Sequence, residues 1–439
     1  MDIIAGMPFF KLEITKAGQV FCAPQKAAIE DAVRDSGAGK LTDLFVISHG
    51  WNNDSAEARE LYDELFANVS ALMPDHAILA KRKFAVVGIF WPSKKFADRE
   101  LIPSGGAASL DDGANLSSSE VKQKLDSLKG TFDVPDEGLL ERAKMLIDDI
   151  ENDVAKQDEF VRIIRSLVPN APSDAADDAS DQLFNQEPRQ LLAALAKPSF
   201  PPAAGGGGIA LGMDDQAGGA ASFEDFFSGI NAAAWRLLNY ATYYQMKERA
   251  GMVGKAVNSV LGAVRNLRPD LRIHLIGHSF GARVVTAAVD GPAAIRPSSL
   301  SLLQGAFSHN GFSEKFDGER DGFFRKVVGQ SKVAGPILAT HTVNDKAVGI
   351  AYAIASRLSF DNANALGDEN DVYGGIGRNG VVKMKQAEFV RGTLLPASGV
   401  YEFVPKKVHN LQADAFIADH NDVKGPQVAH AILSAVEST

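Results

Sequence analysis

The chain has 439 residues, a formal net charge of -10 and a hydrophobic fraction of 45%. This length is enough for one large α/β domain with insertions or for two domains, and the acidic balance argues against general binding of nucleic acid or anionic membranes. The single cysteine, Cys22, excludes an intramolecular disulfide and is compatible with a reducing compartment.

The N-terminus, 1–6, lacks the basic region and the apolar core of a signal peptide. No uninterrupted apolar stretch is long enough to span a bilayer. We therefore expect a cytoplasmic protein without an integral membrane segment, although export that uses no cleavable signal would leave no trace in these patterns. Nothing in the composition indicates an oligomeric state.

The first 92 residues alternate strand and helix patterns. Phe10, Leu12 and Ile14 alternate with polar residues, which predicts a hairpin with a turn at Ala17-Gly18. Apolar runs predict two strands buried on both faces, with a capped helix between them. The predicted elements are a hairpin at 9–20, a strand at 41–48, a helix from Asp54 or Ser55 to about 73, and a strand at 84–91 that Pro92 ends. This order is typical of a doubly wound, mostly parallel α/β sheet.

About 180 residues then separate Pro92 from the next strand, where one crossover helix would suffice. Apolar spacing predicts a helix over 138–167, followed by a Ser/Asp/Ala-rich linker at 173–181 and a glycine-rich run at 198–222. We therefore divide the chain into a first part of the core (1–92), a helical and low-complexity insertion that forms a lid or cap (93–222), and a second part of the core (223–439).

An aromatic-rich helix is predicted over 223–249, and a second helix over 252–267 would be the crossover. The aromatic residues of the first helix either face a lid or are ordinary core.

The motif Gly277-His278-Ser279-Phe280-Gly281 follows the apolar strand 273–276 and precedes a predicted helix. G-x-S-x-G in this context is a nucleophile elbow, a tight turn that raises a serine hydroxyl above the edge of a sheet. The glycines leave room that a Cβ would occupy. Ser279 is therefore the candidate nucleophile.

The remaining elements are expected to continue the alternation of strands and helices. They are strands at 300–307, 336–340, 381–390 and 401–404, and helices at 323–330, 348–358 and 427–436.

A serine nucleophile needs a base and an acid that orients the base, and on this topology they follow in the order Ser, Asp or Glu, His. Asp345 lies beyond the C-terminal end of the predicted strand 336–340, so it is the candidate acid; the alternative is that it only caps the next helix. His420 occupies the late loop before the last helix and is the candidate base, with His409 as its rival.

Two histidines near the elbow are not candidates for the base. His278 lies inside the elbow, and we expect its side chain to point away from the site. His274 lies on the elbow strand and is expected to be a satisfied core residue.

An oxyanion hole needs two backbone donors, one after the nucleophile and one from the loop after an early strand. The amides of Phe280 and Trp51 meet these requirements, and Gly50 allows the second loop to approach closely. His49 precedes the serine in the chain, so we interpret it as a brace for this loop.

Ser279 in its elbow, the His-Gly-Trp loop at 49–51, and Asp345 and His420 in this order resemble the α/β-hydrolase superfamily. The resemblance covers roughly 41–92 and 271–439. It implies a Ser-His-Asp hydrolase with oxyanion amides at Trp51 and Phe280, and it implies no particular substrate.

More narrowly, His-Gly-Trp-Asn-Asn at 49–53 and Phe-Trp-Pro-Ser at 90–93, followed by Arg99, are similar to a group of bacterial serine hydrolases in which H-G-[FW]-N-N and W-P-S recur together. The long insertion after Pro92 departs from that pattern, so the geometry of the lid and the shape of the acyl pocket are not carried over.

A formal G-x-G-x-x-G at 375–380 follows acidic residues rather than a strand, so it predicts a turn-rich loop and no dinucleotide site. The acidic cluster 368–371 lacks the spacing of an EF-hand, and no zinc pattern is present. We expect no cofactor and no metal.

The sequence thus predicts a serine esterase or lipase that acts on a small-molecule ester or lipid through an acyl-enzyme. An amidase or peptidase with the same triad, or an inactive binding protein on a hydrolase scaffold, remains an alternative.

Overall fold

The computed structural model describes residues 2–35, 37, 40–51, 53–93, 117–168, 180–196, 229–348 and 373–439. Within these ranges nine strands form one mixed sheet in the order β1-β2-β4-β3-β5-β6-β7-β9-β8. Only β1 is antiparallel to its neighbour, so the predicted α/β class with a mostly parallel sheet is confirmed. The strands are β1 (Asp2–Ile4), β2 (Met7–Glu13), β3 (Asp43–Ser48), β4 (Phe84–Phe90), β5 (Arg272–His278), β6 (Ser299–Leu303), β7 (Ile337–His341), β8 (Phe389–Thr393) and β9 (Val408–Gln412).

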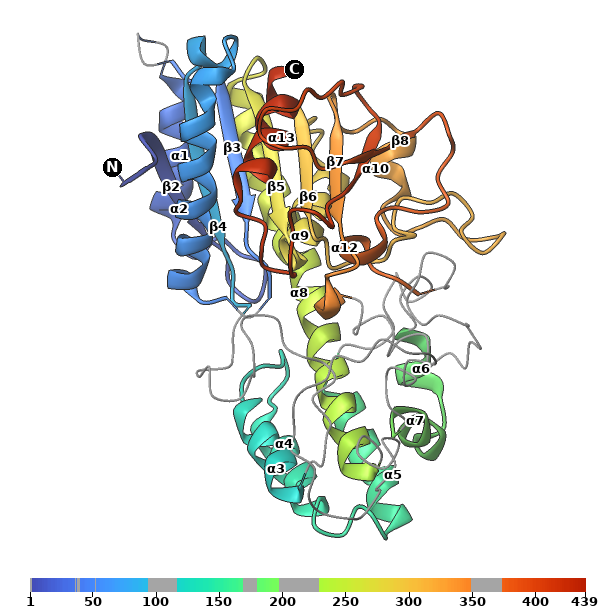
Figure 1. The fold of residues 1–439 in the computed structure, drawn as a ribbon. Helices are drawn as coiled ribbons and strands as arrows, with labels where there is room; N and C mark the ends of the chain where they lie inside the picture. Colours follow the sequence, from blue (N-terminus) through green and yellow to red (C-terminus); the bar gives the residue numbers. More distant parts are fainter. Residues whose placement is uncertain are drawn as a thin grey trace, which may run out of the picture.

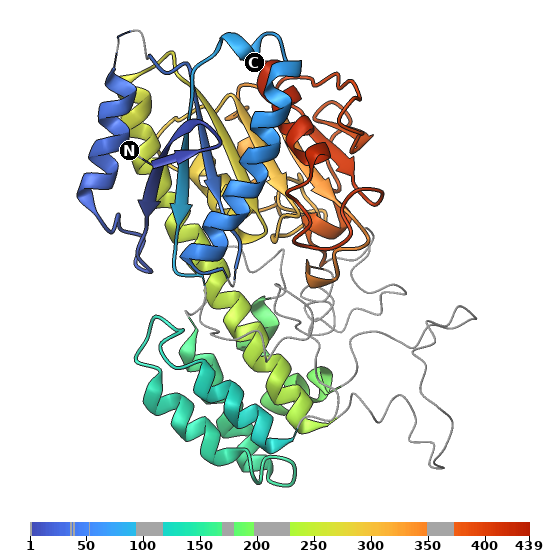
Figure 2. The same ribbon diagram turned by 60° about the vertical axis from the view of Figure 1, so that its left-hand side comes forward.

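Helices cover both faces of this sheet (Figures 1 and 2). Leu44 and Val46 of β3 belong to a core cluster shared with α1, α8 and α9, while Phe45 and Ile47 belong to a second cluster shared with α2 and α13. This alternation follows from the two-residue period of a strand. The helices of the sheet-bearing part are α1 (Ala23–Arg34), α2 (Ser55–Leu72), α8 (Ile230–Leu267), α9 (Phe280–Asp290), α10 (Arg325–Gly329), α12 (Ile376–Asn379) and α13 (Pro426–Glu437), with short 3-10 turns η1 (Met73–Asp75) and η2 (Leu79–Lys81).

The 38-residue helix α8 joins the sheet to a separate helical part. Its C-terminal half packs on α9 and α1, whereas its N-terminal half packs on α3, α5 and α7 (Figure 1). The carboxyl ends of the parallel strands face this helical part (Figure 2). The helical part contains α3 (Ser118–Ser127), α4 (Glu137–Leu146), α5 (Val154–Leu167), α6 (Ser180–Asn185) and α7 (Pro188–Leu195).

Arg249 of α8 contacts both the sheet-bearing part and the helical part. Its guanidinium donates to the carbonyl oxygens of Pro92 (2.9 Å) and Thr131 (2.8 Å) and forms an ion pair with Asp133 (2.6 Å). Pro92 lies two residues after β4, and Thr131 lies between α3 and α4. The buried Arg249 side chain therefore links the carboxyl end of β4 to the helical part.

Several predicted elements of the first half need correction. The helix expected over 138–167 is interrupted, because Asp153 starts a new helix by accepting from the amides of Ala155 and Lys156. Conversely, the two helices expected between 223 and 267 are one continuous helix from Ile230 onward, and 223–228 lie outside the described residues. The hairpin at 9–20 is reduced to one bridge, between Ile14 and Val20, and β2 pairs with β1 and β4 instead. The predicted segments at 173–179 and 198–222 also lie outside the described residues, as does most of the helix expected over 348–358.

The second half has two misplaced strands. The chain is not extended into a strand over 381–385 or 401–404, and the strands are β8 and β9 instead. Asn410 of β9 explains the first difference, because its side-chain amide bonds both the amide and the carbonyl of Val381 (2.9 and 2.8 Å). The backbone of Val381 is thereby satisfied without a strand partner.

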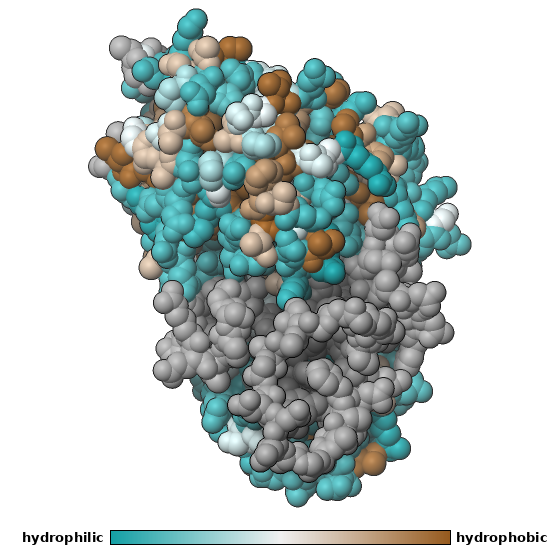
Figure 3. Space-filling view, in the orientation of Figure 1, coloured by the Kyte–Doolittle hydropathy of each residue, from teal (hydrophilic) through white to brown (hydrophobic). Residues whose placement is uncertain are grey.

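Hydrophobic and hydrophilic residues are interspersed over the sheet-bearing part of the face seen in Figure 3. In the described ranges, no helix has the length and apolar character needed to cross a membrane.

Candidate active site

Ser279 stands at the sharp turn between β5 and α9. Its backbone has φ 56° and ψ -124°, a conformation that residues other than glycine rarely adopt and that is typical of a nucleophile elbow. Two hydrogen bonds fix the turn: the Ser279 amide donates to Leu303 O of β6, and the Ala306 amide donates to Ser279 O, both at 3.0 Å. The neighbouring strand therefore stabilises the strained residue.

The glycines of the motif are required by close backbone contacts. A Cβ on Gly277 would lie 2.4 Å from Gly281 O, and one on Gly281 would lie 2.1 Å from Ser48 O. These separations are far below van der Waals contact, so the expected tightness of the turn is confirmed. The second contact also brings the start of α9 directly against the end of β3.

The loop after β3 lies against the serine. A Cβ on Gly50 would be 2.5 Å from Cβ of Ser279 and 3.0 Å from its Oγ. Within the described residues, the amides of Trp51 and Phe280 donate to no acceptor, although the first amides of a helix commonly need an external partner. The rings of Trp51 and Phe280 also touch edge to face, with centroids 6.1 Å apart. Two available backbone donors thus belong to residues that flank Ser279.

His49 braces this loop, as predicted. The Trp91 amide donates to His49 Nε2 (3.3 Å), so Nδ1 carries the proton and donates to Gly50 O (2.9 Å). The His49 and Trp91 rings stack with an interplanar angle of 12°. Burial lowers the pKa of His49 to about 4, which keeps the imidazole neutral in this arrangement.

Asp345 and His420 form a buried pair. His420 Nδ1 lies 2.9 Å from Asp345 Oδ2, and neither side chain is more than 8% exposed. The two loops are also joined through Asn344, whose side-chain amide donates to the carbonyl oxygens of Asp414 (3.2 Å) and Ile417 (2.9 Å). Asp345 accepts a hydrogen bond from Nδ1 of His420. The second ring nitrogen, Nε2, therefore has no proton and can accept one from another group.

The carboxylate of Asp345 serves two purposes. Oδ1 accepts from the Val348 amide (3.0 Å), so the residue does cap the following helical turn, while Oδ2 faces His420. The predicted acid role and the helix-cap alternative are therefore compatible, since each uses a different oxygen.

The sequence did not indicate Gln304, which donates a hydrogen bond to the candidate acid Asp345. Gln304 follows β6, is fully buried and has φ 46°. Its side-chain amide donates to Gly377 O (2.8 Å) and to Asp345 Oδ2 (3.3 Å). Both partners are acceptors, which fixes the orientation of the amide. No sequence signal marks Gln304, because its importance depends on Gly377, a residue 73 positions away.

Gly377 belongs to the formal G-x-G-x-x-G motif. A Cβ there would lie 2.6 Å from Asp345 Oδ2. The glycine therefore makes room for the carboxylate. The four-residue helix α12 lies inside the motif, whereas a dinucleotide fingerprint would open a longer helix.

The expectation for His278 is wrong, because its side chain points toward the candidate base. His278 Nε2 lies 2.8 Å from the backbone oxygen of His420, and the two ring centroids are 5.0 Å apart. Ser279 is the next residue in the chain, so the loop of His420 contacts the elbow itself. Within the described residues no hydrogen bond joins Ser279 Oγ to His420; such bonds are often long in structures without substrate.

The rival histidine lies elsewhere. His409 is on β9, where its Nε2 accepts from the Val404 amide (3.0 Å) and its ring contacts Phe403. His274 is also a satisfied core residue, as predicted, because its nitrogens contact Asp43 Oδ1 (3.0 Å) and Ser299 Oγ (2.9 Å). Its side chain is 0% exposed, so this second Ser, His and Asp set has no access to a substrate.

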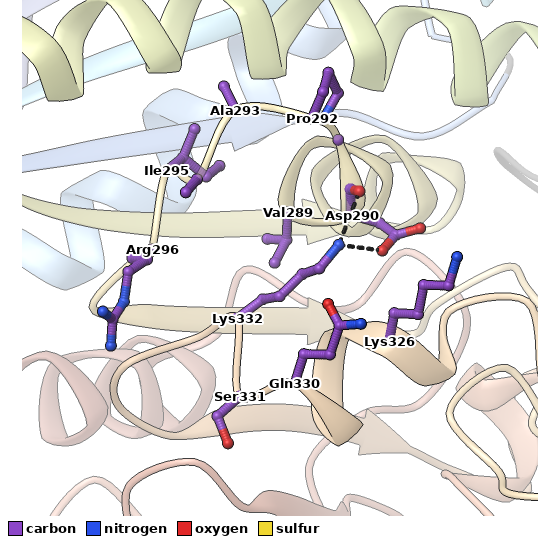
Figure 4. A pocket seen from close by; sticks show the side chains of 12 residues that line it. Val289, Asp290, Pro292, Ala293, Ile295, Arg296, Lys326, Gln330, Ser331 and Lys332 are labelled. Carbon is purple, nitrogen blue, oxygen red and sulfur yellow. Dashed lines mark hydrogen bonds and ion pairs between the residues drawn. The ribbon is translucent and has the colours of Figure 1, made fainter.

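A separate cavity of about 640 Å³ lies at the far end of α9 (Figure 4). Lys332 enters it and bonds both the carboxylate (2.6 Å) and the backbone oxygen (2.9 Å) of Asp290, the last residue of that helix. Ser279 is at the opposite end of α9, so this cavity is not part of the candidate site. Among the described residues no cluster of His, Cys, Asp or Glu could hold a metal ion.

Comparisons with protein-family models, with curated proteins and with solved structures found no match. What this site does is therefore inferred from its own geometry.

Proposed function

We propose that the protein is a serine hydrolase of the α/β-hydrolase fold that cleaves carboxylic esters through an acyl-enzyme. The observation that carries this proposal is the buried Asp345–His420 pair in contact with the elbow that presents Ser279. Ser279, Asp345 and His420 follow the parallel strands β5, β7 and β9, and the chain order Ser, Asp, His is the order of that fold.

In the proposed reaction, Ser279 Oγ attacks the ester carbonyl while His420 Nε2 takes its proton. The amides of Trp51 and Phe280 stabilise the oxyanion, and Asp345 stabilises the imidazolium. The intermediate collapses as His420 returns the proton to the departing alcohol. Water then attacks the acyl carbon while His420 removes its proton. His420 returns this proton to Ser279 Oγ as the acyl–Oγ bond breaks, and the acid is released.

Aromatic rings next to the serine favour an apolar or aromatic acyl group. Trp51 and Tyr243 both contact Phe280, with ring centroids 6.1 and 5.0 Å away. Tyr243 belongs to α8, which continues into the helical part, and we propose that this part acts as a cap over the acyl site. A pocket of this kind binds esters of low polarity in preference to charged substrates.

Labelling with a fluorophosphonate probe tests the proposal. We expect one adduct per chain in the wild-type protein and none in Ser279→Ala. Failure of the folded wild-type protein to react would favour an inactive binding protein. A panel of p-nitrophenyl esters of increasing acyl length with a matching anilide then separates the substrate classes: turnover of the anilide alone would indicate an amidase and contradict the ester assignment.

A further inference from the structure

His278 makes a contact with the candidate base that the proposed reaction does not itself require. Its Nε2 lies 2.8 Å from the His420 carbonyl oxygen, which can only accept, so Nε2 is the protonated nitrogen. The two residues are 142 positions apart in the chain. A side chain of the elbow thus holds the backbone of the residue that must reach Ser279.

The environment keeps this contact constant with pH. His278 is 4% exposed, and burial together with the neighbouring His420 lowers its pKa to about 3. The imidazole therefore stays neutral and adds no positive charge beside His420 when that ring becomes protonated. Within the described residues, Nδ1 of His278 is buried without a hydrogen-bond partner, so Nε2 makes the specific contact of this side chain.

The covalent position of His278 makes the contact useful. It immediately precedes Ser279, whose backbone is fixed by β6 through Leu303 O and the Ala306 amide. The His420 ring also rests against the His278 ring, at 5.0 Å and 42°. Any shift of the His420 loop relative to the nucleophile would break the hydrogen bond and this ring contact together.

We propose that His278 is a positioning residue. Its Nε2–H holds the His420 loop and its ring supports the His420 ring, so that the base stays at the distance and orientation that it needs relative to Ser279. This inference rests on the proposed hydrolase function. It assigns to the variable second residue of the G-x-S-x-G motif a role in coupling nucleophile and base.

Replacing His278 by Gln or by Asn distinguishes the effect of the hydrogen bond to His420 O from the effect of a polar side chain at this position. The amide nitrogen of Gln reaches about as far as Nε2 of His, whereas that of Asn reaches only about as far as Nδ1. We expect His278→Gln to retain most of the labelling rate and His278→Asn to lose about 10- to 100-fold, since misplacement of a reacting group by about 1 Å has an effect of this size. His274→Gln is the matched control, because His274 is an equally buried histidine of the same strand that does not touch the site.

The decisive measurement is a double-mutant cycle with His420→Ala, using the fluorophosphonate labelling rate of folded, full-length protein. If His278 acts through the base, His278→Asn has no further effect once His420 is absent. An equal loss in both backgrounds, or wild-type labelling of His278→Asn, would overturn the inference while leaving the hydrolase proposal standing. An unlabelled wild-type protein would overturn both. If His278→Asn does not fold, His278→Gln decides the question. A folded His278→Gln variant with a labelling rate far below that of the wild-type protein would equally contradict the assignment.

Discussion

Nδ1 of His420 lies 2.9 Å from Oδ2 of Asp345, although 75 residues separate the two in the chain. Asp345 follows β7 and His420 follows β9, and these two strands are parallel neighbours. Their carboxyl ends meet at one edge of the sheet, which is where β5 delivers Ser279. The site is thus assembled by the strand order.

The first prediction distinguishes the two candidate bases. We expect His420→Ala to lower kcat on a p-nitrophenyl ester by several orders of magnitude, because removal of the base leaves the serine protonated. His409→Ala should keep kcat close to the wild-type value, since the His409 ring contacts Val404 and Phe403, neither of which belongs to the candidate site. Steady-state kinetics of both folded variants provide the measurement. Loss of activity in His409→Ala with normal turnover in His420→Ala would reverse the assignment.

The second prediction concerns the orientation of the acid. Gln304→Met preserves the approximate shape of the side chain but removes the amide that donates to Asp345 Oδ2 and Gly377 O. A hydrogen bond to a charged group contributes about 1.5–3 kcal/mol, so we expect kcat/KM to fall by roughly 10- to 100-fold. Active-site titration should accompany the kinetics, to correct for any unfolded fraction. Unchanged kcat/KM per titrated site would show that the Val348 amide alone is sufficient to hold the carboxylate.

The third prediction concerns the approach of the oxyanion loop. Gly50→Ala places a methyl group where only 2.5 Å separate it from Cβ of Ser279, so the loop must move away. We expect labelling and turnover to fall by about 100-fold or more, because the Trp51 amide then no longer faces the developing charge. Gly138→Ala is the control, since a Cβ there meets no atom within 4 Å. Comparable losses in both variants would contradict the proposed close approach.

The fourth prediction concerns stability in mild acid. Burial lowers the pKa of His49 to about 4 and that of His278 to about 3, whereas both titrate near 6.5 when unfolded. The unfolded chain therefore binds more protons below pH 6.5, and the free energy of unfolding falls as the pH decreases toward 4. Each histidine should contribute about 2 kcal/mol of this loss between about pH 7 and pH 5.

Urea unfolding at these two pH values measures the effect. His49→Gln removes one of the histidines whose pKa is lowered by burial, so the unfolding free energy of the variant should depend less steeply on pH than that of the wild-type protein. An identical pH dependence in the variant would show that His49 is not the source.

Sequence patterns were sufficient to predict elements that are determined by interactions between residues close together in the chain. The apolar runs predicted β3 and β4, Asp54 and Glu57 form the capping box that starts α2, and the strand–turn–helix context of the elbow is present around Ser279. Strand periodicity, helix capping and the steric demands of a tight turn all act within a few residues. Asp345 and His420 could also be chosen from the sequence, because chain order on a parallel sheet restricts where partners of a serine can lie.

Features that depend on partners elsewhere in the chain were decided only by the tertiary structure. The polar strand β9 escaped notice because His409 and Asn410 are satisfied by Val404 and Val381, and α8 continues past Gly251 because its C-terminal half packs on α9. Gln304 carries no local mark, and His278 turns toward the site since its acceptor, the His420 carbonyl, comes from another strand end. Hydrogen bonds such as Gln304–Asp345 (41 residues apart) and His278–His420 (142 residues apart) are set by how the sheet brings loops together, which a local pattern does not encode.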